Sequence, residues 1–265
     1  MLLINEDERY LSAHISDLAA QSVKSGVPRF SRFLNERERV VAADAVRAEN
    51  ANPIFCGGYD GAARNVCGFF EGTYAEDYPE NVDDCEAFQG MTKKDLYPIC
   101  AVTFSYRKVD KLTHRDFLGA VLGAGLERSM LGDILVAEDY AIVFCLDVVQ
   151  EIVAGITKVG KIGVKTNCGL TRGLPVIKTE TLEKTVSSLR LDCIVGACTN
   201  LSRDKSASLI RSGMISADFS VCQNVSFTVS EGTVISIRGY GRFRLARIVG
   251  ESKKGRLHIN VEKSV

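Results

Sequence analysis

The chain has 265 residues, of which 46% are hydrophobic and 25% are charged, and its 33 Lys and Arg balance its 33 Asp and Glu. This length allows two or three small domains, each with its own core. No apolar run approaches the roughly 18–20 residues of a membrane span, so the sequence excludes a transmembrane helix and fits an ordinary globular protein.

The first residues of the chain and its cysteines indicate in which cell compartment the protein is expected. Acidic residues directly follow the first apolar ones, the reverse of the basic start of a secretory signal peptide. The nine cysteines are irregularly spaced without a Cys-x-x-Cys pair, and the closest two, Cys193 and Cys198, have no histidine nearby. We therefore expect a cytoplasmic protein with reduced, mostly packed cysteines and without a metal or other cofactor.

The balanced charge hides an asymmetry along the chain. Residues 170–265 contain 15 Lys and Arg against 8 Asp and Glu, a net charge of +7. Residues 1–169 contain the remaining 18 and 25, a net charge of −7. A basic C-terminal third suggests one module that binds a polyanion, although charge alone also fits chance clustering.

The N-terminal segment, residues 1–92, is predicted to be an α/β domain. The spacing of its apolar residues and a glycine turn predict two helices and then two short strands, at 6–24, 35–49, 52–61 and 64–70. The acidic stretch 71–90, which contains Gly, Pro and Asn, is typical of an exposed connection.

The central segment, residues 93–169, has a clearer pattern. Its elements are predicted in the order strand, helix, strand, strand, helix, strand, at 97–106, 114–123, 133–137, 140–146, 147–159 and 161–166. Thr113 and Asp116 form a capping box for the first helix. The order βαββαβ is that of ferredoxin-like domains, a topology that RNA-recognition domains share. We therefore expect this fold here.

Two features of the central segment could each form a ligand site or serve only the fold. RNA-recognition domains stack bases on aromatic side chains, for which Phe104, Tyr106 and Phe144 are candidates. They lack a surrounding run of basic and aromatic residues, so packing explains them better. The glycine cluster at 119–125 could be a phosphate cradle, but it follows a helix, whereas a phosphate loop follows a strand.

The C-terminal segment, residues 185–265, follows a linker at 170–184. Ser187 or Ser188 can start a first helix, and Ser202 can cap a second helix that reaches Arg211. Short strands are then predicted at 214–217, 225–229, 234–239 and 243–249.

Basic residues gather in this segment. Arg190 and Arg203 begin the two helices, where free backbone N–H groups already favour phosphate. The forked arginine guanidinium matches phosphate oxygens, and three arginines of the sheet would extend the patch. We expect these side chains to be largely exposed. The predicted RNA-binding residues are Arg190, Ser202, Arg203, Lys205, Arg211, Arg238, Arg242 and Arg244.

The strings R-L-D at 190–192 and SRDKSASLIRSGMI at 202–215 resemble the RNA-binding S4 domain. Its usual pattern is R-L-D, a short gap, then S-R-x-x-A-x-x-L-I-x-x-G-x-V and a strand. Ser206 stands where that pattern usually has Ala, and Asp218 where it usually has Asn. The second departure places an acid near the expected RNA face.

The resemblance extends over nearly the whole chain. The string LTHRDFLGAVLGAGLERSMLGDILV at 112–136, together with RGYGRFRL at 238–245, resembles the YlmH family of bacterial RNA-binding proteins. The resemblance implies an N-terminal domain, a ferredoxin-like central domain and a C-terminal S4 domain. It also implies binding to tRNA and to the large ribosomal subunit. Family members have been linked to quality control of stalled nascent chains, and their genes lie near cell-division genes.

An RNA-modifying enzyme is the alternative, because S4 domains also occur on pseudouridine synthases and RNA methyltransferases. The R-L-D string superficially resembles that of a pseudouridine synthase, in which the aspartate is the nucleophile, but Asp192 lies inside the S4-like helix and lacks the following T-S-G. A role as a helix-start acid or hydrogen-bond partner explains Asp192 better. His14, His114 and His258 are far apart, and a nucleophile with its base cannot be assembled from sequence.

The sequence thus predicts an α+β protein of three domains that binds RNA without catalysis. We expect a monomer whose partners are rRNA and tRNA on the large ribosomal subunit.

Overall fold

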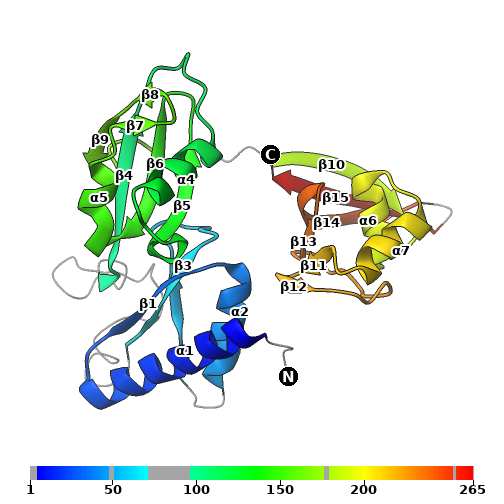
Figure 1. The fold of residues 1–265 in the computed structure, drawn as a ribbon. Helices are drawn as coiled ribbons and strands as arrows, with labels where there is room; N and C mark the ends of the chain where they lie inside the picture. Colours follow the sequence, from blue (N-terminus) through cyan, green and yellow to red (C-terminus); the bar gives the residue numbers. More distant parts are fainter. Residues whose placement is uncertain (1–4, 48–50, 71–95, 176–178, 253–254, 265) are drawn as a thin grey trace. The chain divides into compact units, whose positions relative to one another are not determined.

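The computed structural model describes residues 5–47, 51–70, 96–175, 179–252 and 255–264, so the predicted connection at 71–90 lies outside the described residues. The chain divides into two units, Met1–Pro175 and Val176–Val265 (Figure 1). Among the helices in the described ranges, none has both the length and the apolar character that crossing a membrane requires.

Two helices and a three-stranded antiparallel sheet form the N-terminal part of the first unit. They are α1 (Glu6–Ser25), β1 (Arg29–Leu34), α2 (Glu36–Ala45), β2 (Ile54–Cys56) and β3 (Asn65–Phe69), with strand order β1-β3-β2. Figure 1 shows both helices (blue) beside this sheet. Asn5 and Asn35 each form a capping box with the glutamate three residues later, which fixes where the helices begin. Strand β1 was not predicted from the sequence.

The rest of the first unit is built on a four-stranded antiparallel sheet. Its elements are β4 (Ile99–Ser105), α4 (His114–Gly123), η2 (Arg128–Met130), β5 (Leu131–Val136), β6 (Tyr140–Leu146), η3 (Asp147–Val149), α5 (Gln150–Ala154), β7 (Lys158–Val159), β8 (Ile162–Gly163) and β9 (Lys165–Cys168). The strand order is β5-β6-β4-β9, and β7 and β8 form a separate hairpin. The order βαββαβ is therefore present, with this hairpin inserted before the last strand.

Of the two predicted helices of this part, the one with a capping box was predicted correctly and the other was predicted too long. Helix α4 covers the predicted residues, and Thr113 and Asp116 form the predicted capping box. The second helix was predicted to reach residue 159, but α5 ends at Ala154. Gly155 and the β-branched residues after it are weak helix formers, and Val159 instead pairs with Ile162 in the hairpin.

One hydrophobic cluster joins the predicted N-terminal and central segments, and the N-terminal segment also forms a second cluster of its own. Phe33 and Val66 from the N-terminal strands are buried in the same cluster as Phe144 of β6. Gly58, at φ +91°, lies so close to the Phe144 ring that an added Cβ would be 2.6 Å from it. The Tyr59 ring stacks on Phe144 with a centroid distance of 5.0 Å. The described residues on both sides of the predicted boundary at 92–93 therefore belong to one compact unit.

The aromatic residues weighed for base stacking lie inside this core. Phe104 and Phe144 are buried, and Tyr106 is almost completely buried, with its hydroxyl donating to the Ala137 carbonyl at 2.7 Å. Phe104 and Tyr106 also pack against the Phe117 ring of α4. Packing is thus the role that the structure gives them.

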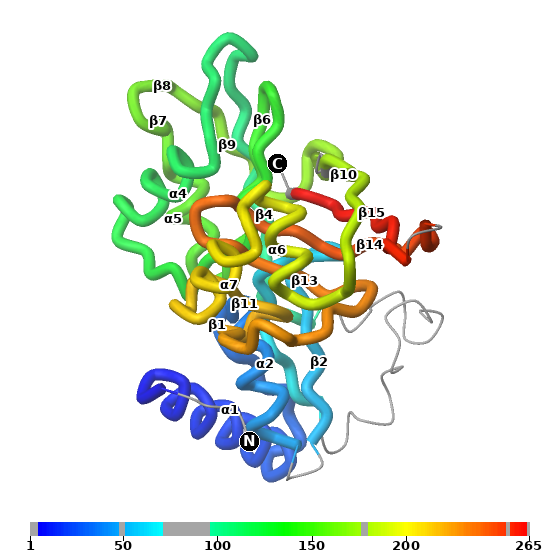
Figure 2. Tube along the Cα trace, turned by 90° about the vertical axis from the view of Figure 1, so that its right-hand side faces the viewer, coloured from blue at the N-terminus to red at the C-terminus, as the bar shows by residue number. Residues whose placement is uncertain are grey.

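The second unit is a six-stranded antiparallel sheet with two helices. Its elements are β10 (Thr179–Val186), α6 (Leu191–Thr199), α7 (Arg203–Arg211), β11 (Ile215–Ala217), β12 (Ser220–Val221), β13 (Val234–Ile237), β14 (Gly241–Glu251) and β15 (Leu257–Ser264). The strand order is β10-β15-β14-β13-β11-β12. Figures 1 and 2 both show α6 and α7 (yellow) side by side next to the sheet.

Two segments of this unit differ from the prediction. Strand β10 occupies part of the stretch that was expected to be a linker, and it pairs with β15 along its whole length. The stretch 225–229 was predicted to be a strand, but it is a loop whose carbonyl groups bond to the start of α6. Leu191 donates to the Phe227 carbonyl at 2.8 Å, and Asp192 donates to the Val225 carbonyl at 3.3 Å. These bonds satisfy amides that a helix start leaves free.

Candidate nucleic-acid interface

The candidate interface lies where α6 and α7 begin. The apolar faces of both helices pack on one face of the sheet, because Leu191, Ile194 and Ile210 are buried in one cluster with Ile235 and Phe243. The polar starts of the helices remain at the surface of the unit. Arg190 precedes α6 as its N-cap residue, and Ser202 is the N-cap residue of α7.

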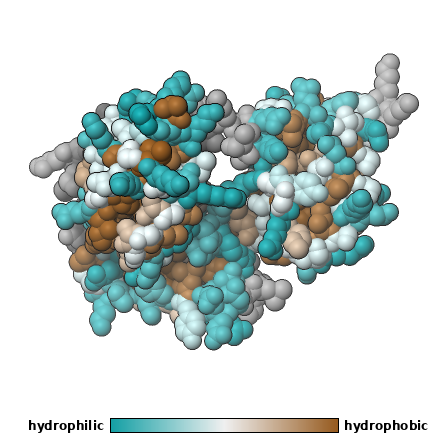
Figure 3. Space-filling model, turned by 45° about the horizontal axis from the view of Figure 1, so that its top comes forward, coloured by the Kyte–Doolittle hydropathy of each residue, from teal (hydrophilic) through white to brown (hydrophobic). Residues whose placement is uncertain are grey.

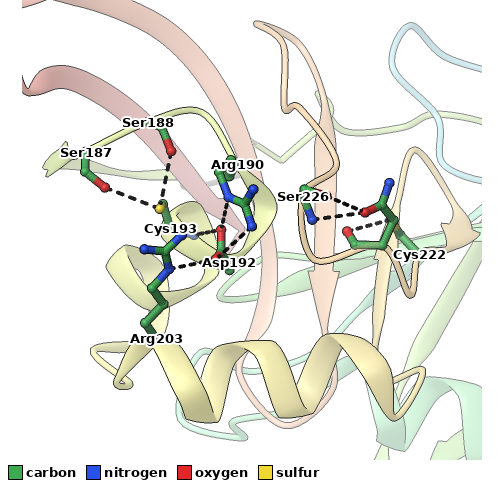
Figure 4. A network of polar contacts seen from close by, with 9 residues as sticks. Ser187, Ser188, Arg190, Asp192, Cys193, Arg203, Cys222 and Ser226 are labelled. Carbon is green, nitrogen blue, oxygen red and sulfur yellow. Dashed lines mark hydrogen bonds and ion pairs between the residues drawn. The ribbon is translucent and has the colours of Figure 1, made fainter.

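Asp192 connects the two helix starts (Figure 4). Its side chain is 2% exposed and forms ion pairs with two arginines. Arg190 Nε donates to Asp192 Oδ1 at 3.1 Å, and Arg203 Nε donates to Asp192 Oδ2 at 2.9 Å. A buried carboxylate thus holds one arginine from the start of each of two consecutive helices.

The two arginines differ in how much of the guanidinium remains available. Arg190 uses both Nε and Nη2 on Asp192, the latter at 3.4 Å, and its side chain is 39% exposed. Arg203 bonds to Asp192 through Nε, and its side chain is 64% exposed. The expectation of a largely exposed side chain thus fits Arg203 well and Arg190 less well. Arg203 presents its terminal nitrogens to solvent.

The electrostatics of the cluster keep its charges in place. Burial opposes ionisation of Asp192, but the hydrogen bonds from Arg190 and Arg203 outweigh it, so the pKa of Asp192 lies below its ordinary value. The hydrogen bond to Asp192 raises the pKa of Arg203 above its ordinary value. Both partners are therefore charged at neutral pH.

The two helix starts are not equally open to an anion. The first two amides of α6 donate to carbonyl groups of the 225–227 loop. This helix start therefore has fewer free N–H donors for a phosphate than the sequence suggested. In α7 the Ser202 hydroxyl accepts from the Lys205 amide at 3.4 Å. The amides of Arg203 and Asp204 have no hydrogen-bond partner within the described part of the chain. The start of α7 therefore combines free backbone donors with an oriented guanidinium.

Within the described part of the chain, the other predicted residues of α7 do not bond to Asp192. Lys205 is exposed, whereas Ser206 and Ile210 of the same helix are buried. Arg211 is the last residue of α7, about 12 Å along the helix axis from Arg203 at 1.5 Å per residue. Ser202 acts on the interface by fixing where α7 begins.

The arginines of the sheet do not extend the helix face. Along β14, Phe243 and Leu245 are buried toward the helices, so Arg242 and Arg244 lie on the opposite face of the sheet. Arg244 pairs there with Glu262, with Nη2 at 2.9 Å from the carboxylate. Arg238 follows β13 in the turn to β14 and is exposed. The eight predicted residues are thus divided between two surfaces of the unit.

Asp192 was also the candidate nucleophile of the enzyme alternative. Its carboxylate is buried, bonded to two guanidinium groups, and accepts from the Cys193 amide at 3.0 Å. This arrangement fits the predicted role of a hydrogen-bond partner. Among the described residues, no group of three or more His, Cys, Asp or Glu side chains is placed to hold a metal ion.

Matches to a protein family, to a curated protein and to a solved structure relate the chain to known proteins. Residues 93–169 match the family described as "Putative RNA-binding domain in YlmH". Over 241 residues the chain is 30% identical to the ribosome-associated protein quality control protein P2 of Bacillus subtilis (strain 168), covering 89% of this chain and 87% of that protein. The solved structure of the cell division protein ylmH from Streptococcus pneumoniae matches with a TM-score of 0.46 and 19% identity, covering 63% of this chain and 94% of that one. The family match coincides with the central segment predicted from the sequence.

Proposed function

The chain belongs to the family of the Bacillus subtilis ribosome-associated protein quality control protein P2, and from this premise we propose that it is a ribosome-associated RNA-binding protein. The match of residues 93–169 to the RNA-binding domain family supports the RNA part of the proposal. The family relationship over 89% of the chain supports the ribosomal part.

The proposal has a more specific form. Residues 185–265 act as an S4 RNA-binding domain, and the protein binds rRNA and tRNA on the large ribosomal subunit as a cytoplasmic monomer. Its role is in the quality control of stalled nascent chains. Two adjoining helices followed by a sheet, with Ser202 at the cap of the second helix, support the assignment of the S4 domain.

One observation carries the mechanism: Arg203 is held by buried Asp192 beside the two free amides at the start of α7. Fixing a long side chain in advance reduces the entropy lost on binding. A phosphate oxygen can then accept hydrogen bonds from the guanidinium and from the backbone together. Lys205 adds positive charge in the first turn of the same helix. Arg190 also pairs with Asp192, so the two guanidinium groups and one carboxylate together keep a net positive charge.

The proposed protein positions RNA and has no catalytic step of its own. The aspartate that the enzyme alternative requires is buried and paired. Binding affinity is therefore the property that substitutions in this cluster should change.

Co-sedimentation with purified large ribosomal subunits tests the proposal. Arg203→Ala should weaken binding about 10- to 30-fold, as expected for the loss of charge-assisted hydrogen bonds to phosphate. Arg247→Ala is the matched control, because Arg247 is an exposed arginine of β14 and its loss changes the net charge equally. It should weaken binding less than about threefold. Equal effects of the two substitutions would contradict an interface at the start of α7.

A further inference from the structure

The second unit has a hollow on its surface, away from the Asp192 cluster. Its volume is about 420 Å³, within the range of about 300–1,000 Å³ that is usual for ligand sites. It lies over β11 and β13 and the turn from β13 to β14. Residues that line it include Met214, Ser216, Val221, Ser236, Arg238 and Arg242.

The hollow has a polar floor and apolar walls. Ser216 and Ser236 are directly opposite each other in the pairing of β11 with β13, on the sheet face that points away from the helices. Within the described part of the chain, no hydrogen bond engages either hydroxyl group. Met214 is 38% exposed and Val221 is 69% exposed, so apolar surface borders these hydroxyls. Figure 3 shows that hydrophobic areas (brown) lie among hydrophilic ones (teal) on the visible face of each unit.

The charge around the hollow is positive. Arg238 and Arg242 are among the residues that line the hollow. The described lining residues include neither Asp nor Glu. Two other carboxylates, those of Asp218 and Glu262, form their bonds outside the residues that line the hollow. Asp218 Oδ1 accepts from the Val234 amide at 2.9 Å, and Glu262 pairs with Arg244. The hollow therefore complements an anion.

A strained turn holds one of the two arginines. Asp218 and Phe219, which connect β11 to β12, have φ values of 45° and 64°, as in a two-residue hairpin turn of type I′. A bulky residue rarely adopts this left-handed conformation. In this conformation the Phe219 ring lies 5.7 Å from the Arg242 guanidinium carbon, a cation–π contact. The turn thus fixes Arg242 at the edge of the hollow.

We propose that this hollow binds an unpaired ribonucleotide of the RNA, an inference that rests on the proposed RNA-binding function. A base is flat, and its two faces are much less polar than its edges, so a face fits against Met214 and Val221. The hydroxyls of Ser216 and Ser236 match the donors and acceptors of a base edge or a ribose. Arg238 and Arg242 are placed for the phosphates on either side.

This site would give the protein a preference for unpaired RNA. The bases of a duplex are stacked and paired, so a hollow of this kind cannot receive them, whereas a bulge or loop can turn a base outward. Arg203 and the amides of α7 contact phosphate and do not require an unpaired base. The two surfaces of the second unit therefore have separable roles.

Anisotropy measurements with two labelled RNA hairpins, one with an unpaired bulge and one fully paired, test this site on the full chain. Ser236→Leu fills the floor of the hollow, and Val234→Leu is the matched control on the same strand and face, outside the hollow. The wild type should prefer the bulged hairpin about tenfold, and Ser236→Leu should abolish this preference without weakening binding to the paired hairpin. Val234→Leu should behave as the wild type.

Photo-crosslinking on the wild type tests the same site without a substitution. 4-Thiouridine in the bulge should crosslink to peptides that contain residues 214–221 or 236–242, as identified by mass spectrometry. Crosslinks confined to residues 190–211, or equal affinity of the wild type for the two hairpins, would overturn the inference and leave the proposed function standing. Failure of the wild type to bind either hairpin or the large ribosomal subunit would instead refute the proposed function itself.

Discussion

Two clusters of arginine around an aspartate occur in this protein, and they are used in opposite ways. In the first unit, Asp133 accepts from the Tyr59 hydroxyl at 2.7 Å and the Ala63 amide at 2.6 Å. The nearby Arg64 and Arg128 donate to backbone carbonyl groups. In the second unit, Asp192 is the buried partner, and Arg203 extends from it into solvent.

The pKa directions express this difference. Burial lowers the pKa of Arg64. Burial is also the larger cause, and the nearby charge of Arg64 the smaller one, that lowers the pKa of Arg128 to about 10. The hydrogen bond to Asp192 raises the pKa of Arg203. Arg64 and Arg128 are therefore structural, because their donors satisfy carbonyl groups of their own unit. Arg203 keeps donors for an external anion.

The largest effect should come from removing an inward-facing arginine. Arg64 donates to the carbonyl groups of Leu131, Phe33 and Arg128, and these bonds join the N-terminal strands to the central sheet. Arg64→Ala should lower the free energy of unfolding by about 3–4.5 kcal/mol, at about 1–1.5 kcal/mol for each of the three lost bonds. Urea denaturation followed by circular dichroism measures this change.

Arg115→Ala is the control for this substitution. Arg115 is exposed on α4, so its removal should change the free energy of unfolding by less than about 0.5 kcal/mol. A comparable loss in both variants would show that Arg64 does not hold the two parts of the unit together.

A smaller loss of stability should follow from removing both partners of Asp192. Arg190→Ala with Arg203→Ala removes both counterions of Asp192, whose carboxylate is 2% exposed while they are in place. This should cost about 1–3 kcal/mol, measured by the same denaturation. Adding Asp192→Ala should recover most of the loss, because the buried charge is then absent. A triple variant less stable than the double one would mean that Asp192 stabilises α6 by other contacts.

The smallest expected effect is the change with pH in the contribution of Asp192 to the free energy of unfolding. The folded pKa of Asp192 is depressed, so its stabilisation is complete above the unfolded pKa, about 3.9, and is lost as the pH falls through the folded value. The stability difference between the wild type and Asp192→Asn should therefore be constant from pH 7 to about 5 and shrink below about pH 4. Denaturation curves across this range check the sign. A difference that grows as the pH falls would contradict the pairing.

Local signals in the sequence predicted much of the fold. The capping box at Thr113 and Asp116 and the cap at Ser202 located α4 and α7, because capping depends on residues three positions apart. Strand β10 was missed because it is an edge strand with mostly polar residues, and its partner β15 begins more than 70 residues later. Strand β1 contains a bulge between Phe30 and Phe33, which interrupts its alternation.

The candidate site was only partly readable from the sequence. The predicted helix starts do bring Arg190 and Arg203 together, but their shared partner depends on how α6 packs against α7. The alternation of Phe243 and Leu245 with the arginines of β14 carried the signal that Arg242 and Arg244 face away from the helices. The hollow could not be predicted, because it depends on strand register and on the turn at Asp218 and Phe219.

The binding of Asp192→Asn to the large ribosomal subunit tests the central claim most directly, that a buried aspartate positions Arg203 for phosphate. The substitution makes the protein one charge more positive, so attraction to RNA by charge alone would tighten binding. An amide holds two guanidinium groups less well than a carboxylate, so loss of positioning should weaken binding instead. We predict that the affinity falls about fivefold in co-sedimentation at constant salt. Unchanged or tighter binding by a folded Asp192→Asn variant would contradict the account.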